Sequence, residues 1–377
     1  MHSYKSMKNL AAILILGLFS GLNSQANELP VECIRFSLEE SFSSISVGEK
    51  SEYFVKCAGE NAKPQPFQAR PRYSETEIKE LHRSFVAITD CLEVDAQLIF
   101  PKLMIESGFH TQIQSRGGDA GIGQLTSKAI NDVDANMPAF KKMIFQSDKT
   151  SCRWLQSTAK ARPSFWQPAL GKSKCTLMDR QNNPLKNLLY TVIFHRLNQR
   201  YVESEFENKN LAALLQQAGY PGQDFASLKR ILVILGYNTG GAVAVRNLQE
   251  FLMSRIDFIQ RKKQEAGADA KSVGYVTAVD FDFTRGLQEF SARKISLRSE
   301  LALQKPKLTD DQLDAQVQVL LRNISVSQYS FPEWLKVWQS HGGPGYVSGL
   351  VGAALRLDQK FGAGICSNAS AFQVWGD

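Results

Sequence analysis

The stretch LMIESGFHTQIQSRGGDAGIGQLT, residues 103–126, places one carboxylate at the end of an apolar run and continues into a polar loop rich in glycine. The carboxylate is Glu106, and Leu103, Ile105 and Phe109 are its apolar neighbours. Such surroundings keep water from a carboxyl group and favour its protonated form. A carboxylic acid that keeps its proton near neutral pH can act as a general acid. A lone glutamate near a helix end is more often a cap or a surface residue. The choice between a structural and a catalytic role for Glu106 therefore depends on the neighbouring sequence.

Two further features favour a functional site. Glycines in residues 117–123 allow the backbone to approach a ligand closely, and Gln124 offers a donor and an acceptor suited to sugar hydroxyl and acetamido groups. More than 100 residues later, the sequence GYNTGG, residues 236–241, ends an apolar helical pattern with Tyr237 and Asn238. A phenol and an amide at such a turn can both point into a cleft.

The rest of the chain predicts a mainly α protein. SETE, residues 74–77, has the pattern of a capping box and predicts a helix that buries Ile78, Leu81 and Phe85. Apolar residues recur at helical spacing in residues 183–201, 225–239 and 345–362, and TDDQ, residues 309–312, is a second capping box. We expect one helical domain over residues 73–377, with insertions at about 134–180 and 252–340 that either line a substrate groove or only cover the core.

The N-terminus predicts export. Lys5 and Lys8 precede an apolar run, residues 10–22, and small residues follow before position 27. This is the three-part pattern of a secretory signal peptide, here residues 1–26, and it predicts a periplasmic or secreted protein with no stable membrane span after cleavage. Residues 27–72 predict a small β-rich appendage, because residues 51–58 are β-prone, followed by a linker with three prolines.

Six cysteines fit an oxidising compartment, and none forms a CxxC pair. Sequence alone leaves their pairing open. Our hypothesis joins near neighbours, Cys33 with Cys57 and Cys152 with Cys175, and leaves Cys91 to pair with Cys366. Buried free thiols are the alternative.

The charge and the histidines argue against two classes of function. The net charge is +7, but the only compact basic run is RKK at residues 261–263, so nucleic-acid binding is weakly supported. The five histidines are scattered without the spacing of metal ligands, and we predict no metal and no cofactor.

Together these motifs resemble the soluble lytic transglycosylases, which cleave peptidoglycan and share a lysozyme-like helical fold. That family has Glu-Ser, a Ser nine residues after the Glu, and then Gly-Ala-x-Gly-Leu-Met-Gln. This chain has Glu106 and Ser107, then Ser115, then GDAGIGQ at residues 118–124. The family's Ala-Tyr-Asn-Ala-Gly is matched by GYNTG at residues 236–240, and its later Tyr-Val pair by Tyr346 and Val347. The resemblance covers residues 75–250 and 344–362.

The resemblance implies a role for each matching position. Glu106 would be the essential acid and base, and Ser107, Ser115 and Gln124 would contact the sugar near the cleaved bond. Tyr237 would hydrogen-bond or orient Glu106, Asn238 would hold substrate or the local backbone, and Tyr346 would line the same cleft. The implied partner is the glycan strand of peptidoglycan; protein partners stay unknown.

Two departures from the family pattern leave alternatives open. Gly123 replaces the usual Met, which predicts a wider loop, and Asp119 replaces the usual Ala. Because a second carboxylate can activate water, a hydrolytic muramidase that uses Glu106 and Asp119, as in goose-type lysozymes, is one alternative. A non-catalytic wall-binding module that has kept the fold is the other.

Overall fold

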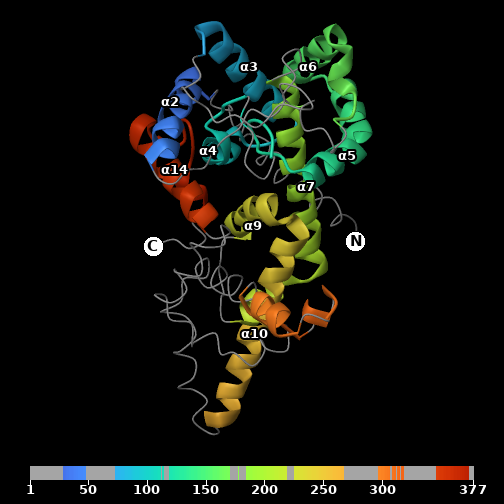
Figure 1. Cartoon of the computed structure of the whole chain (residues 1–377), viewed down its shortest axis with the longest axis vertical. Helices are drawn as coiled ribbons and strands as arrows, with labels where there is room; N and C mark the ends of the chain where they lie inside the picture. The colour runs from blue at the N-terminus through green and yellow to red at the C-terminus, as the bar shows by residue number, and fades with distance from the viewer. Residues whose placement is uncertain are drawn as a thin grey trace, which may run out of the picture.

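The computed structural model of the chain describes residues 29–47, 73–111, 113, 119–169, 177, 184–218, 225–266, 296–305, 308–310, 312–314, 316–317 and 345–372. Within these residues the protein is mainly helical, as the sequence predicts, and β pairing is limited to one isolated bridge. In chain order the elements are α2 (Val31–Val47), α3 (Glu75–Cys91), α4 (Ala96–Ser107), α5 (Ser127–Gln146), α6 (Thr150–Ala161), the 3-10 helix η1 (Pro163–Trp166), α7 (Leu185–Asn208), α8 (Leu211–Gln217), α9 (Phe225–Thr239), α10 (Gly241–Ala266), α14 (Gly345–Phe361) and the 3-10 helix η6 (Ala369–Phe372) (Figure 1).

Helix α3 begins at the predicted capping box. The Ser74 hydroxyl accepts from the Glu77 amide at 3.3 Å, and the Glu77 carboxylate accepts from the Ser74 amide at 2.7 Å. The predicted apolar face, Ile78, Leu81 and Phe85, is buried. A local polar signal and a helical apolar period therefore specify this helix together.

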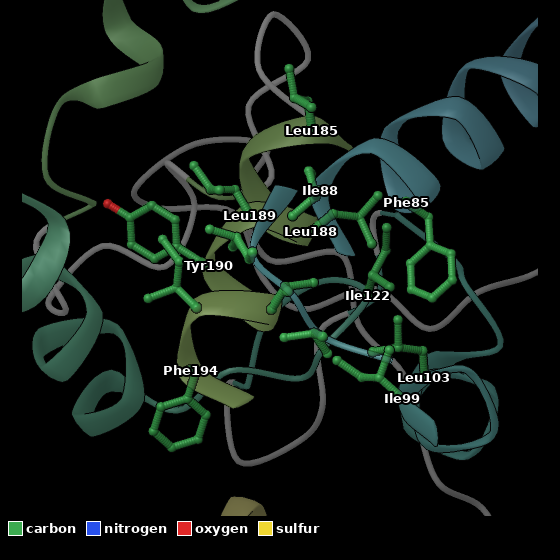
Figure 2. Packing of buried hydrophobic residues seen from close by; sticks show 14 of the residues in the cluster. Phe85, Ile88, Ile99, Leu103, Ile122, Leu185, Leu188, Leu189, Tyr190 and Phe194 are labelled. Atoms are coloured by element: carbon green, nitrogen blue, oxygen red, sulfur yellow. The ribbon is translucent and has the colours of Figure 1, made fainter. Parts of the chain in front are cut away.

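Helix α7 is the central element and contacts α3, α5, α8, α9 and α10. The side chains of residues 185–195 are all buried, so this half of the helix is enclosed on every side. Figure 2 shows Leu188 and Leu189 beside Ile88 of α3, with Ile122 from the loop before α5 in the same cluster.

Helices α5 and α6, with η1, lie beside α3 and α7 (Figure 1). They include most described residues of the insertion predicted at 134–180. Phe140, Ile144, Leu155 and Phe165 of this segment are buried in the main hydrophobic cluster. The described part of the insertion therefore covers the core, and its role in a substrate groove stays a prediction.

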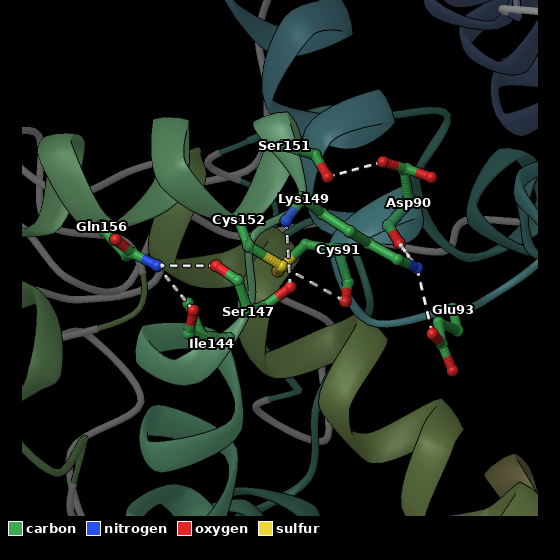
Figure 3. The surroundings of a disulfide bond; sticks show 9 residues. All are labelled: Asp90, Cys91, Glu93, Ile144, Ser147, Lys149, Ser151, Cys152 and Gln156. Atoms are coloured by element: carbon green, nitrogen blue, oxygen red, sulfur yellow. Dashed lines mark hydrogen bonds and ion pairs between the residues drawn. A yellow bond between two sulfur atoms is a disulfide. The ribbon is translucent and has the colours of Figure 1, made fainter.

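A disulfide joins α6 to the end of α3 (Figure 3). Cys91 and Cys152 have Cα atoms 4.9 Å apart. Near them the Lys149 ammonium donates to the Asp90 carbonyl at 3.3 Å and forms an ion pair with Glu93 at 3.0 Å. These contacts are exposed and add little, whereas the disulfide joins the two helices covalently at this end.

Helices α8, α9 and α10 form a second cluster with α7, and α10 extends away from the other helices (Figure 1). Leu297, Leu301, Leu313 and Val317 from the second predicted insertion are buried in this cluster. The second capping box is also present: the Gln312 side-chain oxygen Oε1 accepts from the Thr309 backbone amide at 3.0 Å, and the Thr309 hydroxyl accepts from the Gln312 backbone amide at 3.4 Å.

The two ends of the described chain meet beside α4. Helix α2 and helix α14 both contact α4, and a disulfide between Cys33 and Cys366 joins α2 to the segment after α14. The apolar side chains Ile34 and Leu38 of α2 lie in the main cluster. The described part of the predicted β-rich appendage is thus a helix, whereas residues 51–58, which suggested strands, lie outside the described residues.

The predicted disulfide pairs are wrong. Cys33 bonds Cys366 rather than Cys57, and Cys91 bonds Cys152 rather than Cys366. Cys57 and Cys175 lie outside the described residues. Pairing by sequence proximity failed because the chain brings Cys33 and Cys366, 333 residues apart, to a Cα–Cα distance of 5.7 Å.

The predicted signal peptide, residues 1–26, also lies outside the described residues. Among the described helices, none has both the length and the apolar character that a bilayer crossing requires.

Candidate active site

Glu106 lies in the last turn of α4 and is half-buried. The helix starts at Asp95, whose carboxylate accepts from the Gln97 amide at 2.9 Å. It ends at Gly108, which has φ 59° and donates its amide to the Met104 carbonyl at 3.0 Å. Glycine fits this left-handed position without a steric penalty, so the chain turns sharply just after Glu106.

The described end of the loop after Glu106 makes a tight turn that packs against α7. Ala120 and Leu125 exchange backbone hydrogen bonds of 3.2 and 3.1 Å, which close a tight turn over residues 120–125. The Gly121 amide also donates to the Ile113 carbonyl at 2.7 Å. The glycines of this described turn therefore allow the backbone to form a compact turn.

Two side chains of α7 fill the space next to the glycines. A Cβ at Gly121 would lie 1.9 Å from Asn187 Nδ2, and a Cβ at Gly123 would lie 2.2 Å from Thr191 Oγ1. Our expectation that Gly123 widens the loop is wrong. The missing side chain lets α7 and Tyr237 come close to the backbone, and no space opens at this position.

Tyr237 connects the second motif to this loop. Its hydroxyl donates to the Gly123 carbonyl at 2.6 Å, and its ring packs edge-on against Phe194 of α7 with centroids 4.9 Å apart. Burial raises the pKa of Tyr237 well above its usual value, and the charges of Glu106 and Asp119 raise it further. The phenol therefore keeps its proton as a fixed donor, and both carboxylates are close enough to affect it.

Ser107 and Gln124 turn inward. The Ser107 hydroxyl is fully buried and donates to the Ile122 carbonyl at 2.7 Å. The Gln124 amide donates to the carbonyls of Gly121 and Ile113 at 2.7 and 3.2 Å, and its buried Oε1 has no hydrogen-bond partner among the described residues. In this structure both side chains hold the loop in place, and their contact with sugar stays a prediction.

The remaining predicted residues are only partly described. Asp119 is half-buried and directly precedes the turn over residues 120–125. Asn238 lies in the last turn of α9 and Tyr346 in the first turn of α14, and the side chains of both lie outside the description. Ser115 lies outside the described residues. Helix α14 contacts both α4 and α9, so the elements that carry Glu106, Tyr237 and Tyr346 are neighbours.

The sequence reasoning missed two buried polar residues, Lys102 and His195. Lys102 lies on α4 four residues before Glu106, is 0 % exposed, and has its Nζ 2.5 Å from the centroid of the Tyr237 ring. His195 of α7 is also buried, and burial lowers its pKa to about 3, with help from the charges of Lys102 and Arg196. The signal was present: Lys102 interrupts the apolar run LIFPKLMI, residues 98–105, at a helical interval from Glu106.

Among the described residues, no three His, Cys, Asp or Glu side chains group as metal ligands would. The chain was also compared with protein families, with curated proteins and with solved structures, and none of them matches it. The contacts around Glu106, and the sequence motifs that they join, are therefore the basis for a functional proposal.

Proposed function

We propose that the protein is a peptidoglycan lytic transglycosylase that cleaves the MurNAc-β-1,4-GlcNAc bond and leaves a 1,6-anhydro end on the muramic acid. The observation that carries the proposal is the bond from Tyr237 to the Gly123 carbonyl. It joins two motifs separated by 114 positions in the chain at the loop that follows Glu106. A chance match of two motifs gives no reason for them to meet beside the proposed acid.

In the proposed reaction, Glu106 acts first as acid and then as base. In its protonated form it gives its proton to the oxygen that links the two sugars. As this bond breaks, positive charge develops at the muramyl C1 and the leaving sugar keeps the proton. The Glu106 anion then takes the proton of the muramyl 6-hydroxyl, whose oxygen bonds C1. No water is consumed, so one carboxylate suffices.

Tyr237 and the loop supply rigidity in this scheme. The phenol holds the Gly123 carbonyl, Ser107 holds the Ile122 carbonyl, and Asn187 fills the space beside Gly121. Three helices thus fix the loop relative to Glu106. A catalytic acid needs such fixed surroundings, because a displacement of about 1 Å can cost a factor of about 100 in rate.

Export of the protein is part of the proposal. Glycan strands of the cell wall lie outside the cytoplasm, and the two described disulfides are typical of proteins in an oxidising compartment. We therefore propose a periplasmic or secreted location, reached through the predicted signal peptide at residues 1–26.

Asp119 supports one rival function, a hydrolytic muramidase. Asp119 and Glu106 both raise the pKa of Tyr237, so the two carboxylates lie around the same phenol. In hydrolysis Asp119 would take a proton from water, which would attack C1 and leave a reducing end. The two functions differ in the group that attacks C1, and therefore in their products.

Mass spectrometry of digested peptidoglycan tests both functions. We expect anhydro-muramyl ends from the wild type and from Asp119→Asn, and no products from Glu106→Gln. Glu207→Gln, at an exposed site on α7, is the matched control and should act like the wild type. Reducing ends that vanish in Asp119→Asn would establish the muramidase, and unchanged activity in Glu106→Gln would exclude both functions.

A further inference from the structure

Lys102 is an unusual lysine because its whole side chain is buried. It is 0 % exposed, and its amine has no hydrogen-bond partner among the described residues. Buried lysines are rare and are normally paired, since an unpaired ammonium in an apolar interior is costly. The proposed mechanism does not use Lys102, so its position needs another explanation.

The amine lies where it can affect both groups of the proposed site. Its Nζ is against the face of the Tyr237 ring, 2.5 Å from the centroid. Residues four apart lie on the same face of a helix, so Lys102 and Glu106 are neighbours on α4. Tyr237 in turn holds the Gly123 carbonyl, so the contacts run from Lys102 through Tyr237 to the loop.

Opposing effects act on the charge of this amine. Burial lowers the pKa of Lys102 well below its usual value, while the charge of Glu106 raises it. The Tyr237 ring face also favours the ammonium form. The charges of Lys102 and Arg196 act on His195 of α7, and the charge of Asp119 acts on Tyr237. The charge on the amine therefore depends on whether Glu106 holds its proton.

We propose that Lys102 is a positioning residue that couples the protonation of Glu106 to the placement of Tyr237. Burial disfavours the ammonium form of Lys102, so the amine opposes the acid form of Glu106 less than a solvated lysine would. The Glu106 anion and the ammonium form of Lys102 favour each other, so the proton affinity of each group depends on the charge of the other. A lysine at a solvated position would stay charged throughout and would oppose the acid form of Glu106 from the start.

The main test is a carbon-13 NMR titration of the Glu106 carboxyl, with Glu106→Gln used to assign the signal. In Lys102→Met we expect the midpoint of this titration to move to higher pH by about half a unit or more, because the anion loses the amine. Leu103→Met changes a buried neighbour on the same helix and is the matched control; its midpoint should equal that of the wild type. Equal midpoints in Lys102→Met and the wild type would overturn the proposal.

A reciprocal measurement does not need a Lys102 variant. Since coupling acts equally on both groups, Glu106→Gln should move the titration of the Lys102 side chain, followed at Cε, to lower pH. An unchanged Lys102 titration would also overturn the proposal. This experiment remains decisive if Lys102→Met fails to fold.

The catalytic part of the inference rests on the proposed function. If the wild type cleaves peptidoglycan, kcat/KM should fall at high pH as Glu106 loses its proton. This fall should move to higher pH in Lys102→Met, with a lower kcat and a similar KM, and should stay in place in Leu103→Met. A wild type that does not cleave peptidoglycan would refute the proposed function, while the two titrations would still decide the role of Lys102.

Discussion

Gly123 shows how closely α7 and α9 approach the loop after Glu106. A Cβ at this position would lie 2.2 Å from Thr191 Oγ1 and 2.7 Å from the Tyr237 hydroxyl. We expect Gly123→Ala to lower the free energy of unfolding by about 1–3 kcal/mol, because a well-packed core has to shift to admit the methyl group. Urea unfolding followed by circular dichroism measures this change.

Gly349 provides the control for this substitution. It is exposed on α14, and a Cβ there meets nothing within 4 Å. Alanine is a better helix former than glycine, so Gly349→Ala should raise stability by about 0.5–1 kcal/mol. Adding Thr191→Ala to Gly123→Ala should recover part of the loss. If the two glycine substitutions change the free energy of unfolding equally, the loop admits a methyl group at Gly123 without strain and the prediction is wrong.

His195 should make the protein sensitive to acid. Burial lowers its pKa from 6.5 to about 3 in the folded protein, and the charges of Lys102 and Arg196 act in the same direction. Between these two pH values the unfolded chain binds a proton that the folded protein does not. This group therefore contributes stability above pH 6.5 that is lost as the pH falls towards 3, by about 1.4 kcal/mol per pH unit.

The measurement for His195 is the slope of stability against pH. Carboxyl groups also titrate in acid, so the comparison is between wild type and His195→Gln in urea unfolding at several pH values from 7 to 4. The variant should lose stability less steeply over this range, whatever its stability at pH 7. Parallel curves would contradict the low pKa of His195.

At the scale of elements, the start of α3 depends on the two reciprocal hydrogen bonds between Ser74 and Glu77. Ser74→Ala removes the side-chain acceptor and should cost about 1 kcal/mol of unfolding free energy. Glu77→Ala, and the double variant with Ser74→Ala, complete a double-mutant cycle. Because the two side chains form one motif, their effects should not add, and additive effects would show that the box is not formed.

These elements show which features a sequence reveals. The capping box at Ser74 and the buried run of α7 were predictable because their signals lie within one or two helical turns. Helix α2 was not predicted, because the β-prone residues 51–58 dominated the interpretation of its segment. Its Ile34 and Leu38 do have helical spacing, but the short pattern did not stand out.

The candidate site was predictable only in part. Glu106 and Tyr237 were found because their motifs are recognisable, and the structure brings their elements together. The inward orientation of Ser107 and Gln124 could not be predicted, because it depends on where the Ile122 and Gly121 carbonyls lie after folding. Lys102 stands out as a charge inside an apolar helix, but its contact with Tyr237 could not be predicted because the sequence gives no hint of its neighbours on α9.

At the scale of the whole molecule, the last described residues return to the first. Cys366 follows α14 and bonds Cys33 of α2, and both helices pack on α4, which carries Glu106. The Gln97 side chain of α4 also donates to the Gly364 carbonyl. No local pattern encodes such a closure, which is why the predicted disulfide pairs were wrong.

Removal of the Cys33–Cys366 disulfide should loosen one part of the molecule more than the rest. The double variant Cys33→Ser and Cys366→Ser should lose about 2–4 kcal/mol of unfolding free energy, because the bond closes a long loop in the unfolded chain. Hydrogen exchange should increase in α2, α14 and the start of α4, which the bond holds together, and stay unchanged in α10, which packs in the other cluster. The matched variant Cys91→Ser and Cys152→Ser should instead loosen α3 and α6. A uniform increase over all helices in both variants would show that the two bonds stabilise one cooperative unit and no separate part of it.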